Sequence, residues 1–295
     1  MERINAYENL RGLVYSPFYI GLAEGIFAEA GVDLKATLSS SGEETADGVA
    51  AGRVDISWGG PMRVMAAHDK NSTANLVCFG LAVSKDPFLV IARTPDPTFS
   101  ASKLATKRLA VATHAPTPWL LLQEDVRRAG LDPDTIERTE GVDPEDALRQ
   151  LTGGQIDYML AFEPWGTIAE QSGQGVVISA GARRGPLAFT SFYAPAPFLT
   201  ERPDAVCALI KGLGNCLTRL RTMPAEEAAS IVKPWFPDFE LNALSGAIQR
   251  YQRLGIWPQS PKITADGYVR LKSSLISGGF ITSDPAFEKL VPRLD

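Results

Sequence analysis

The stretch Tyr15-Ser16-Pro17-Phe18 has the residue types of a ligand-binding turn. A Ser followed by Pro is a start signal for a helix, and a mostly apolar run, Leu10 to Val14, precedes it. The first backbone N–H groups of such a helix have no partner inside it, so they can hold a ligand's oxygen or anionic group. Tyr15 and Phe18 would add flat apolar walls beside them. An ordinary capped turn between a strand and a helix is the competing interpretation.

The order of elements that begins at this turn occurs twice in the chain. In each half a Pro turn opens a helix that ends at Ala-Gly, at Gly31 in the first half and at Gly130 in the second. The first of these helices is expected over residues 18–29. Each half continues with a short helix, a strand that begins near Asp55 or Asp157, and another Pro turn. The two aspartates are interpreted as structural turn residues. The repeated set predicts two similar lobes.

The alternation of strands and helices predicts an α/β fold with mostly parallel sheets and flanking helices. We expect a discontinuous first lobe, residues 1–90 and 190–295 with the C-terminal helices, and a second lobe, residues 91–189. Two crossings, near Phe88 and Phe189, would hinge the lobes. Ligands of such sheets sit beyond the carboxyl ends of the strands, which here would face one cleft. Closure around a ligand is the expected motion.

Composition narrows the function classes. The chain has 295 residues and a net charge of −5, which disfavours a nucleic-acid partner or a broad anionic-membrane surface. No apolar run reaches the roughly 18 residues of a membrane span, so we expect no direct membrane insertion. No basic-then-apolar leader precedes the first strand. The expected location is therefore periplasmic if a leader was removed, and cytoplasmic if the chain is complete as given.

Three segments, Tyr15–Phe27, Gly31–Leu34 and Gly52–Ile56, resemble the substrate-binding components of nitrate/sulfonate/taurine-type ABC importers. The thiamin-precursor (pyrimidine) binding proteins belong to the same group. The resemblance covers roughly residues 4–200. It implies a type II periplasmic-binding-protein fold, binding of a small-molecule solute without catalysis, and delivery of that solute to an ABC permease.

Candidate ligand residues in the first lobe follow its strands. The indole of Trp58 could stack on a planar ligand, although a core position is equally consistent with the sequence. Arg63 could pair with a carboxylate or sulfonate, or could simply face solvent. Gly59 and Gly60 would let the backbone approach a ligand closely. For Ser40 and Ser41 a plain helix cap is the alternative interpretation. The other candidates in this lobe are Tyr15, Ser16, Pro17 and Phe18.

In the second lobe, His114, Thr117 and Trp119 occupy the position equivalent to the first turn. His114 could donate to an anion or a heteroaromatic nitrogen, or could be a surface residue. Glu163 stands before Pro164, where the family often has an acidic residue, and could accept from an amino or ring N–H group. A solvent-exposed turn is the alternative. The candidates together favour a small, flat, partly apolar solute with one polar or anionic group.

An enzyme on the same fold remains an alternative, because the resembling group is related to decarboxylases, desulfinases and a pyrimidine synthase. The three cysteines, Cys78, Cys207 and Cys216, lie outside the expected cleft loops, and no cofactor, metal site or catalytic residue is predicted. A cytoplasmic ligand sensor is a further alternative. Binding without turnover is the favoured interpretation.

Overall fold

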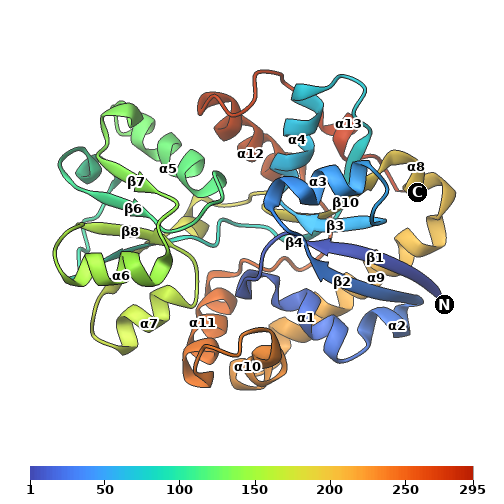
Figure 1. Ribbon diagram of the computed structural model, residues 1–295, viewed down its shortest axis with the longest axis horizontal. Helices are drawn as coiled ribbons and strands as arrows, with labels where there is room; N and C mark the ends of the chain where they lie inside the picture. Colours follow the sequence, from blue (N-terminus) through green and yellow to red (C-terminus); the bar gives the residue numbers. More distant parts are fainter. Residues whose placement is uncertain (295) are drawn as a thin grey trace.

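Each lobe of the computed structural model, which describes residues 1–294, contains a five-stranded sheet flanked by helices (Figure 1). The strand order of the first sheet is β2 (Val32–Leu38), β1 (Glu2–Glu8), β3 (Ile56–Gly59), β10 (Thr190–Pro195) and β4 (Leu76–Val83). The order of the second is β7 (Arg138–Glu140), β6 (Leu109–Val111), β8 (Tyr158–Ala161), β5 (Leu89–Ala92) and β9 (Val176–Ala180).

The two sheets have the same topology. In the first, β1 pairs in parallel with β2 and β3, while β10 is antiparallel to both β3 and β4. In the second, β6 pairs in parallel with β7 and β8, while β5 is antiparallel to both β8 and β9. The antiparallel strand of each sheet comes directly after a chain crossing from the other lobe. The predicted α/β class with two similar, mostly parallel sheets is confirmed.

The proposed lobe boundaries, near residues 90 and 190, lie close to these crossings. The first lobe was proposed to end at Asp295, which lies outside the described residues. The first lobe contains α1 (Ser16–Ala23), α2 (Ile26–Ala30), α3 (Gly42–Ala50) and α4 (Pro61–Lys70), and the second contains α5 (Thr117–Arg128), α6 (Pro144–Thr152) and α7 (Trp165–Gln171). Short 3-10 helices are η1 (Leu13–Tyr15), η2 (Ala101–Thr106), η3 (Pro133–Thr135), η4 (Gly181–Arg184) and η5 (Lys233–Trp235).

The single helix predicted over residues 18–29 is wrong, because the structure has two helices there. α1 ends at Ala23 and α2 begins at Ile26. Between them Gly25 has φ +70°, in the left-handed region that favours glycine and that does not continue a right-handed helix. The helical sequence pattern was continuous across Gly25, whereas the backbone is not.

The crossings are hydrogen-bonded to each other. Leu187 N donates to Ser84 O at 2.8 Å, and Phe189 N donates to Val83 O at 3.0 Å. Towards the second lobe, the Arg184 guanidinium contacts the buried carboxylate of Asp86 and lies 2.6 Å from the carboxylate of Asp125 on α5. Backbone and side-chain contacts therefore join the two crossings and fasten them to the second lobe.

The C-terminal segment folds into the helices α8 (Ala196–Glu201), α9 (Pro203–Thr222), α10 (Ala225–Val232), α11 (Leu241–Leu254), α12 (Ala265–Ser277) and α13 (Phe287–Leu290). α9 packs against α1 and α2. α11 packs against α10 on one side and α7 of the second lobe on the other, and α12 packs against both α4 and α5 (Figure 1). Two helices thus bridge the lobes in addition to the two crossings.

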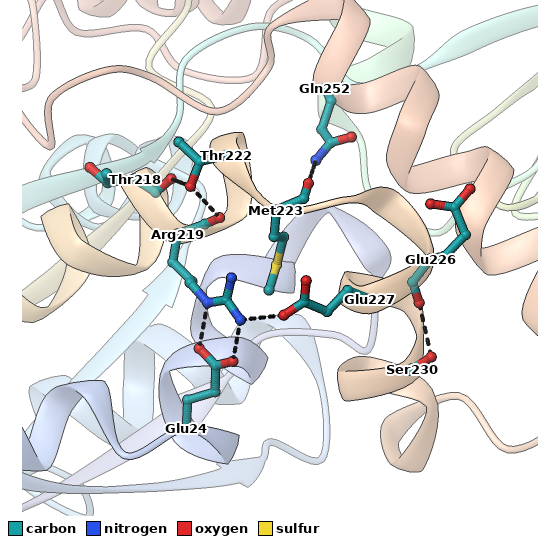
Figure 2. Close-up of polar contacts among 9 residues, drawn as sticks. All are labelled: Glu24, Thr218, Arg219, Thr222, Met223, Glu226, Glu227, Ser230 and Gln252. Carbon is teal, nitrogen blue, oxygen red and sulfur yellow. Dashed lines mark hydrogen bonds and ion pairs between the residues drawn. The ribbon is translucent and has the colours of Figure 1, made fainter.

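Polar contacts fasten α9 to its neighbours (Figure 2). Arg219 of α9 binds both carboxylate oxygens of Glu24, at 3.1 and 2.9 Å, and also contacts Glu227 of α10. Gln252 of α11 donates to Leu220 O at 2.8 Å and to Met223 O at 3.1 Å, at the C-terminal end of α9. These bonds fix the C-terminal helices against the end of α1.

Asp55 and Asp157 have equivalent structural roles, as the repeat predicts. Asp55 Oδ2 accepts from Asn5 N at 2.7 Å, and Asp157 Oδ2 accepts from Arg108 N at 3.0 Å. Each carboxylate therefore joins the start of β3 or β8 to the neighbouring strand region.

Within residues 1–294, no helix is both long and apolar enough to cross a bilayer.

The contact between α9 and α2 predicts opposite effects for two glycines of one helix. A Cβ at Gly212 would lie 2.6 Å from the Phe27 ring, whereas a Cβ at Gly214 meets nothing closer than Pro261 at 3.8 Å. We expect Gly212→Ala to destabilise the fold by about 1–3 kcal/mol through overpacking. Gly214→Ala should stabilise it by up to about 1 kcal/mol through helix propensity. Urea unfolding measures both; equal effects would contradict the described packing.

Candidate functional site

A cleft lies between the lobes, at the carboxyl ends of the strands and beside the crossings. It encloses about 580 Å³ of empty space, including the part open to solvent. The first lobe contributes Asn9, Leu10, Val14, Tyr15, Gly60, Met62 and Arg63; the second contributes Thr113, Ala115, Pro116, Thr117 and Phe162; the crossings contribute Pro87, Phe88 and Phe189. We call this space the interlobe cleft.

Two helices begin at the interlobe cleft from opposite lobes. Gly60 is the N-cap residue of α4, and Pro116 is the N-cap residue of α5; both residues line the cleft. Neither helix has a side-chain cap. Pro61 and Pro118 have no N–H, and Arg63 N donates to Gly60 O at 3.0 Å, so each end offers fewer free N–H groups than a full first turn. Such ends carry partial positive charge and favour an anionic group.

Arg63 is half-buried in the first turn of α4, and it alone carries a full charge among the described residues that line the interlobe cleft. Its guanidinium lies against Gly42, where an added Cβ would overlap it. Within residues 1–294 it makes no ion pair and no side-chain hydrogen bond. A half-buried guanidinium without a partner has five N–H donors available for a ligand.

Tyr15 lies at the N-cap position of α1 and is 3% exposed. Burial raises the pKa of its phenol, and the nearby Asn9 and Thr190 side chains offset part of that rise. The phenol is therefore neutral at physiological pH and can donate a hydrogen bond. Asn9 itself accepts from Thr45 Oγ1 at 3.2 Å, which fixes its amide beside the cleft.

Of the candidates from the sequence, the structure brings Tyr15, Gly60, Arg63 and Thr117 together around the interlobe cleft. Thr117 is the first residue of α5 and is 7% exposed. These four come from both lobes, so the cleft is formed only when both are in place. Their contact with a ligand remains a proposal.

Phe18 and Trp58 lie in the core of the first lobe instead. Their rings stack at 4.4 Å, and Phe18 also packs against Phe192 at 5.3 Å. Both side chains are fully buried. Pro17 is buried too, and Ser16 Oγ donates to Leu13 O at 2.6 Å. The side chains of Ser16, Pro17 and Phe18 are therefore buried in the protein, and only the N-cap residue Tyr15 lines the cleft.

The remaining loop candidates lie outside the lining of the interlobe cleft. Ser40 is exposed, and Ser41 caps α3 by accepting from Glu44 N at 3.1 Å. Gly59 is buried against Asn9 and Tyr193.

In the second lobe, His114 is exposed beside Gly141. Trp119 is 3% exposed in the core, with the Arg138 guanidinium 4.4 Å from its ring centroid. Of the three candidates at the start of α5, only Thr117 therefore lines the interlobe cleft.

Glu163 is fully buried and serves as a structural anchor. Its carboxylate accepts from Thr167 N at 2.9 Å and Thr167 Oγ1 at 3.0 Å, and pairs with Arg250 of α11 at 2.6 Å. Burial raises the pKa of Glu163, and the Arg250 charge opposes that rise. The carboxylate is thus satisfied by the protein and holds α11 against the second lobe.

Sequence reasoning missed much of the apolar wall. Leu10, Val14, Met62 and Phe162 line the interlobe cleft, as does the polar Asn9. Asn9 directly follows β1 and Phe162 directly follows β8, so the rule that ligands lie beyond strand ends could have identified both. The others could not be separated from ordinary core residues by sequence alone.

None of the three cysteines lines the interlobe cleft. Cys78 and Cys216 are buried, which raises the pKa of each thiol to about 12, and Cys207 is exposed on α9. Over residues 1–294, no group of His, Cys, Asp and Glu side chains could hold a metal ion.

Comparison with known proteins identifies the family of the chain. The model of the NMT1-like family matches residues 13–233, which include both halves of the repeat. The chain belongs to the NMT1-like family. Among curated proteins, this NMT1-like chain is 19% identical to YtlA of Bacillus subtilis (strain 168), which is provisionally named as a binding protein, over 99% of this chain and 88% of YtlA.

Solved structures show the fold of this NMT1-like protein. It superposes on the periplasmic aliphatic sulphonate binding protein SsuA from Escherichia coli with a TM-score of 0.78 and 14% identity, over 99% of this chain and 92% of SsuA. It also superposes on the desulfurization enzyme DSZB with a TM-score of 0.69 and 13% identity, over 99% and 96% of the two chains. The two-lobed fold therefore occurs in both binding proteins and enzymes.

The Glu163–Arg250 pair predicts a pH-dependent loss of stability. Arg250→Ala leaves a buried carboxylate without its cation and should destabilise the NMT1-like fold by about 3–5 kcal/mol at neutral pH. Without the Arg250 charge, the pKa of Glu163 rises further in the variant. As the pH falls through that pKa the carboxylate is protonated, so the difference in free energy of unfolding between wild type and variant becomes smaller in acid. Urea unfolding at several pH values measures this.

Arg253→Ala is the matched control, because Arg253 is exposed on the same helix and should change stability by less than about 0.5 kcal/mol. A loss for Arg250→Ala that is small at neutral pH, or that grows in acid, would contradict the anchoring role of Glu163.

Proposed function

We propose that this protein is the substrate-binding component of an ABC importer and that its ligand is a small organic anion. The solute would lie in the interlobe cleft, with its anionic group at Arg63 and its flat, partly apolar body against the surrounding side chains. The family match and the fold shared with a sulphonate binding protein support the binding role. The chemistry of the cleft supports the anion.

The observation that carries the proposal is the unpaired guanidinium of Arg63. It is half-buried, lines the interlobe cleft and has no ion-pair partner in the described chain. The N-termini of α4 and α5 converge on the same space, and Tyr15 adds a neutral phenol donor. Several donors without a carboxylate among them select for negative charge.

The rest of the lining limits what else the solute can carry. Leu10, Val14, Met62, Phe88 and Phe189 present apolar surface, and one arginine balances one negative charge. A sulfonate or carboxylate on a planar or branched apolar body satisfies both parts of the lining. A phosphate-dense ligand would lack cations to pair with.

An ABC permease is the partner that this role implies. The solute-loaded protein would dock on the permease and release its ligand there. That function would require export if the permease faces the periplasm, so the coding sequence upstream of Met1 and the neighbouring genes bear directly on the proposal.

Arg63→Gln should weaken binding of an organic sulfonate or carboxylate roughly 10- to 150-fold, the equivalent of one charge-assisted hydrogen-bonded contact worth about 1.5–3 kcal/mol. A thermal-shift screen of alkane- and arylsulfonates and matching carboxylates would provide the ligand, and titration calorimetry the affinity. Neutral sulfonamides and amides of the same shape should give no shift.

Arg53→Gln is the control, because Arg53 is exposed, pairs with Glu44 at 2.9 and 2.8 Å, and is absent from the lining of the cleft. It should bind as wild type does. Equal binding by wild type and Arg63→Gln would refute the anion site. Chemical conversion of a bound hit would instead indicate an enzyme.

A further inference from the structure

The five tryptophans fall into two groups by exposure. Trp58, Trp119 and Trp257 are at most 3% exposed. Trp165 and Trp235 are half-buried, although they come from different parts of the chain, and both line the same hollow. A group of partly exposed, large apolar side chains in one concavity more often marks an interaction or ligand-binding site than imperfect packing.

We call this space the aromatic hollow. It encloses about 660 Å³ of empty space, including the part open to solvent. Its lining comes from three segments and one further proline: Arg11, Gly12, Leu13, Pro144, Phe162, Glu163, Pro164, Trp165, Trp235, Phe236, Pro237, Asp238 and Phe239. Five of these residues are aromatic, so the hollow can hold a flat apolar group between ring faces and edges.

The rings of the aromatic hollow are held in place by their neighbours. Trp165 meets Phe239 edge to face at 5.8 Å, and Trp235 stacks on Tyr19 at 5.2 Å. A rigid aromatic wall binds an apolar group at a lower entropic cost than a mobile one.

Two of the charges at the aromatic hollow are already paired. Arg11 pairs with Glu8 at 3.2 Å, and Glu163 pairs with Arg250 at 2.6 Å. Asp238 is exposed to solvent. The hollow therefore offers no free cation for a second anionic group, and its lining suits an uncharged group.

The aromatic hollow adjoins the interlobe cleft. Phe162 lines both spaces. Leu10 and Val14 line the cleft, whereas the three residues between them, 11–13, line the hollow. One short segment of chain and one phenyl ring thus stand between the anion site and the tryptophans.

We propose that the aromatic hollow binds the distal end of the same solute. The ligand class is then an elongated monoanion: a sulfonate or carboxylate held at Arg63, joined to a flat, uncharged apolar arm that passes Phe162 and ends against Trp165 and Trp235. This inference rests on the proposed function, because the cleft must hold the anionic end.

Titration calorimetry with methanesulfonate and biphenyl-4-sulfonate tests the arm. Wild type should bind biphenyl-4-sulfonate at least 10-fold more tightly than methanesulfonate. Trp165→Leu should remove most of that advantage and leave methanesulfonate binding unchanged. Phe280→Leu, at an exposed residue outside both spaces, should leave both affinities unchanged.

A second measurement needs no variant. Acrylamide quenches exposed indoles, and in this protein Trp165 and Trp235 are the more accessible ones among the five. Biphenyl-4-sulfonate should protect the wild-type fluorescence from acrylamide, whereas methanesulfonate should not. This readout decides the matter if Trp165→Leu fails to fold.

The outcomes separate the two proposals. Equal affinities for the short and long sulfonates, with no protection of fluorescence, would overturn the role of the aromatic hollow and leave the anion site standing. Binding of neither sulfonate, together with no effect of Arg63→Gln on any anion in the panel, would overturn the proposed function itself.

Discussion

Hydrogen bonds between the two chain crossings are the constraint on which the rest of the structure depends. They join Ser84 to Leu187 and Val83 to Phe189, and the Arg184 contacts with Asp86 and Asp125 fix them to the second lobe. Because the crossings also supply Phe88 and Phe189 to the cleft lining, the hinge and the floor of the site are one piece of structure. Movement of the lobes would change the shape of that floor.

The crossings are not the only connection. α11 and α12 each contact both lobes, and the Glu163–Arg250 pair fastens α11 to the second. Closure about the crossings must therefore repack two helix contacts as well. Because α11 and α12 contact both lobes, the angle between the lobes can vary less than it could if the two crossings were the only connections.

The sequence predicted the architecture because the architecture is repeated. One Pro turn before a helix is common, but the same order of turns, helices and strand starts in both halves could come only from two similar units. The equivalent bonds made by Asp55 and Asp157 show how far that equivalence extends. The break at Gly25 was missed because the residues around it favour a helix and only the backbone angle reveals the interruption.

The residues of the site were harder to predict from the sequence than the fold. Sequence places a residue near a strand end but does not say which way its side chain points. Phe18 and Trp58 lie in the right region and face the core, where they stack on each other. Arg63 could equally have been a solvated side chain, and its distinction is the lack of a protein partner, which only three-dimensional contacts disclose. Glu163 acquires its partner from α11, more than 80 residues later.

The place of β10 in the first sheet also sets the order in which the two lobes can be completed during synthesis. The strands of the second sheet, β5 to β9, lie within residues 89–180 and emerge from the ribosome as one continuous segment. The first sheet has a gap between β3 and β4 until β10, residues 190–195, has been made. The lobe that begins the chain is therefore the later one to complete, and its two open strand edges need shielding from other nascent chains until then.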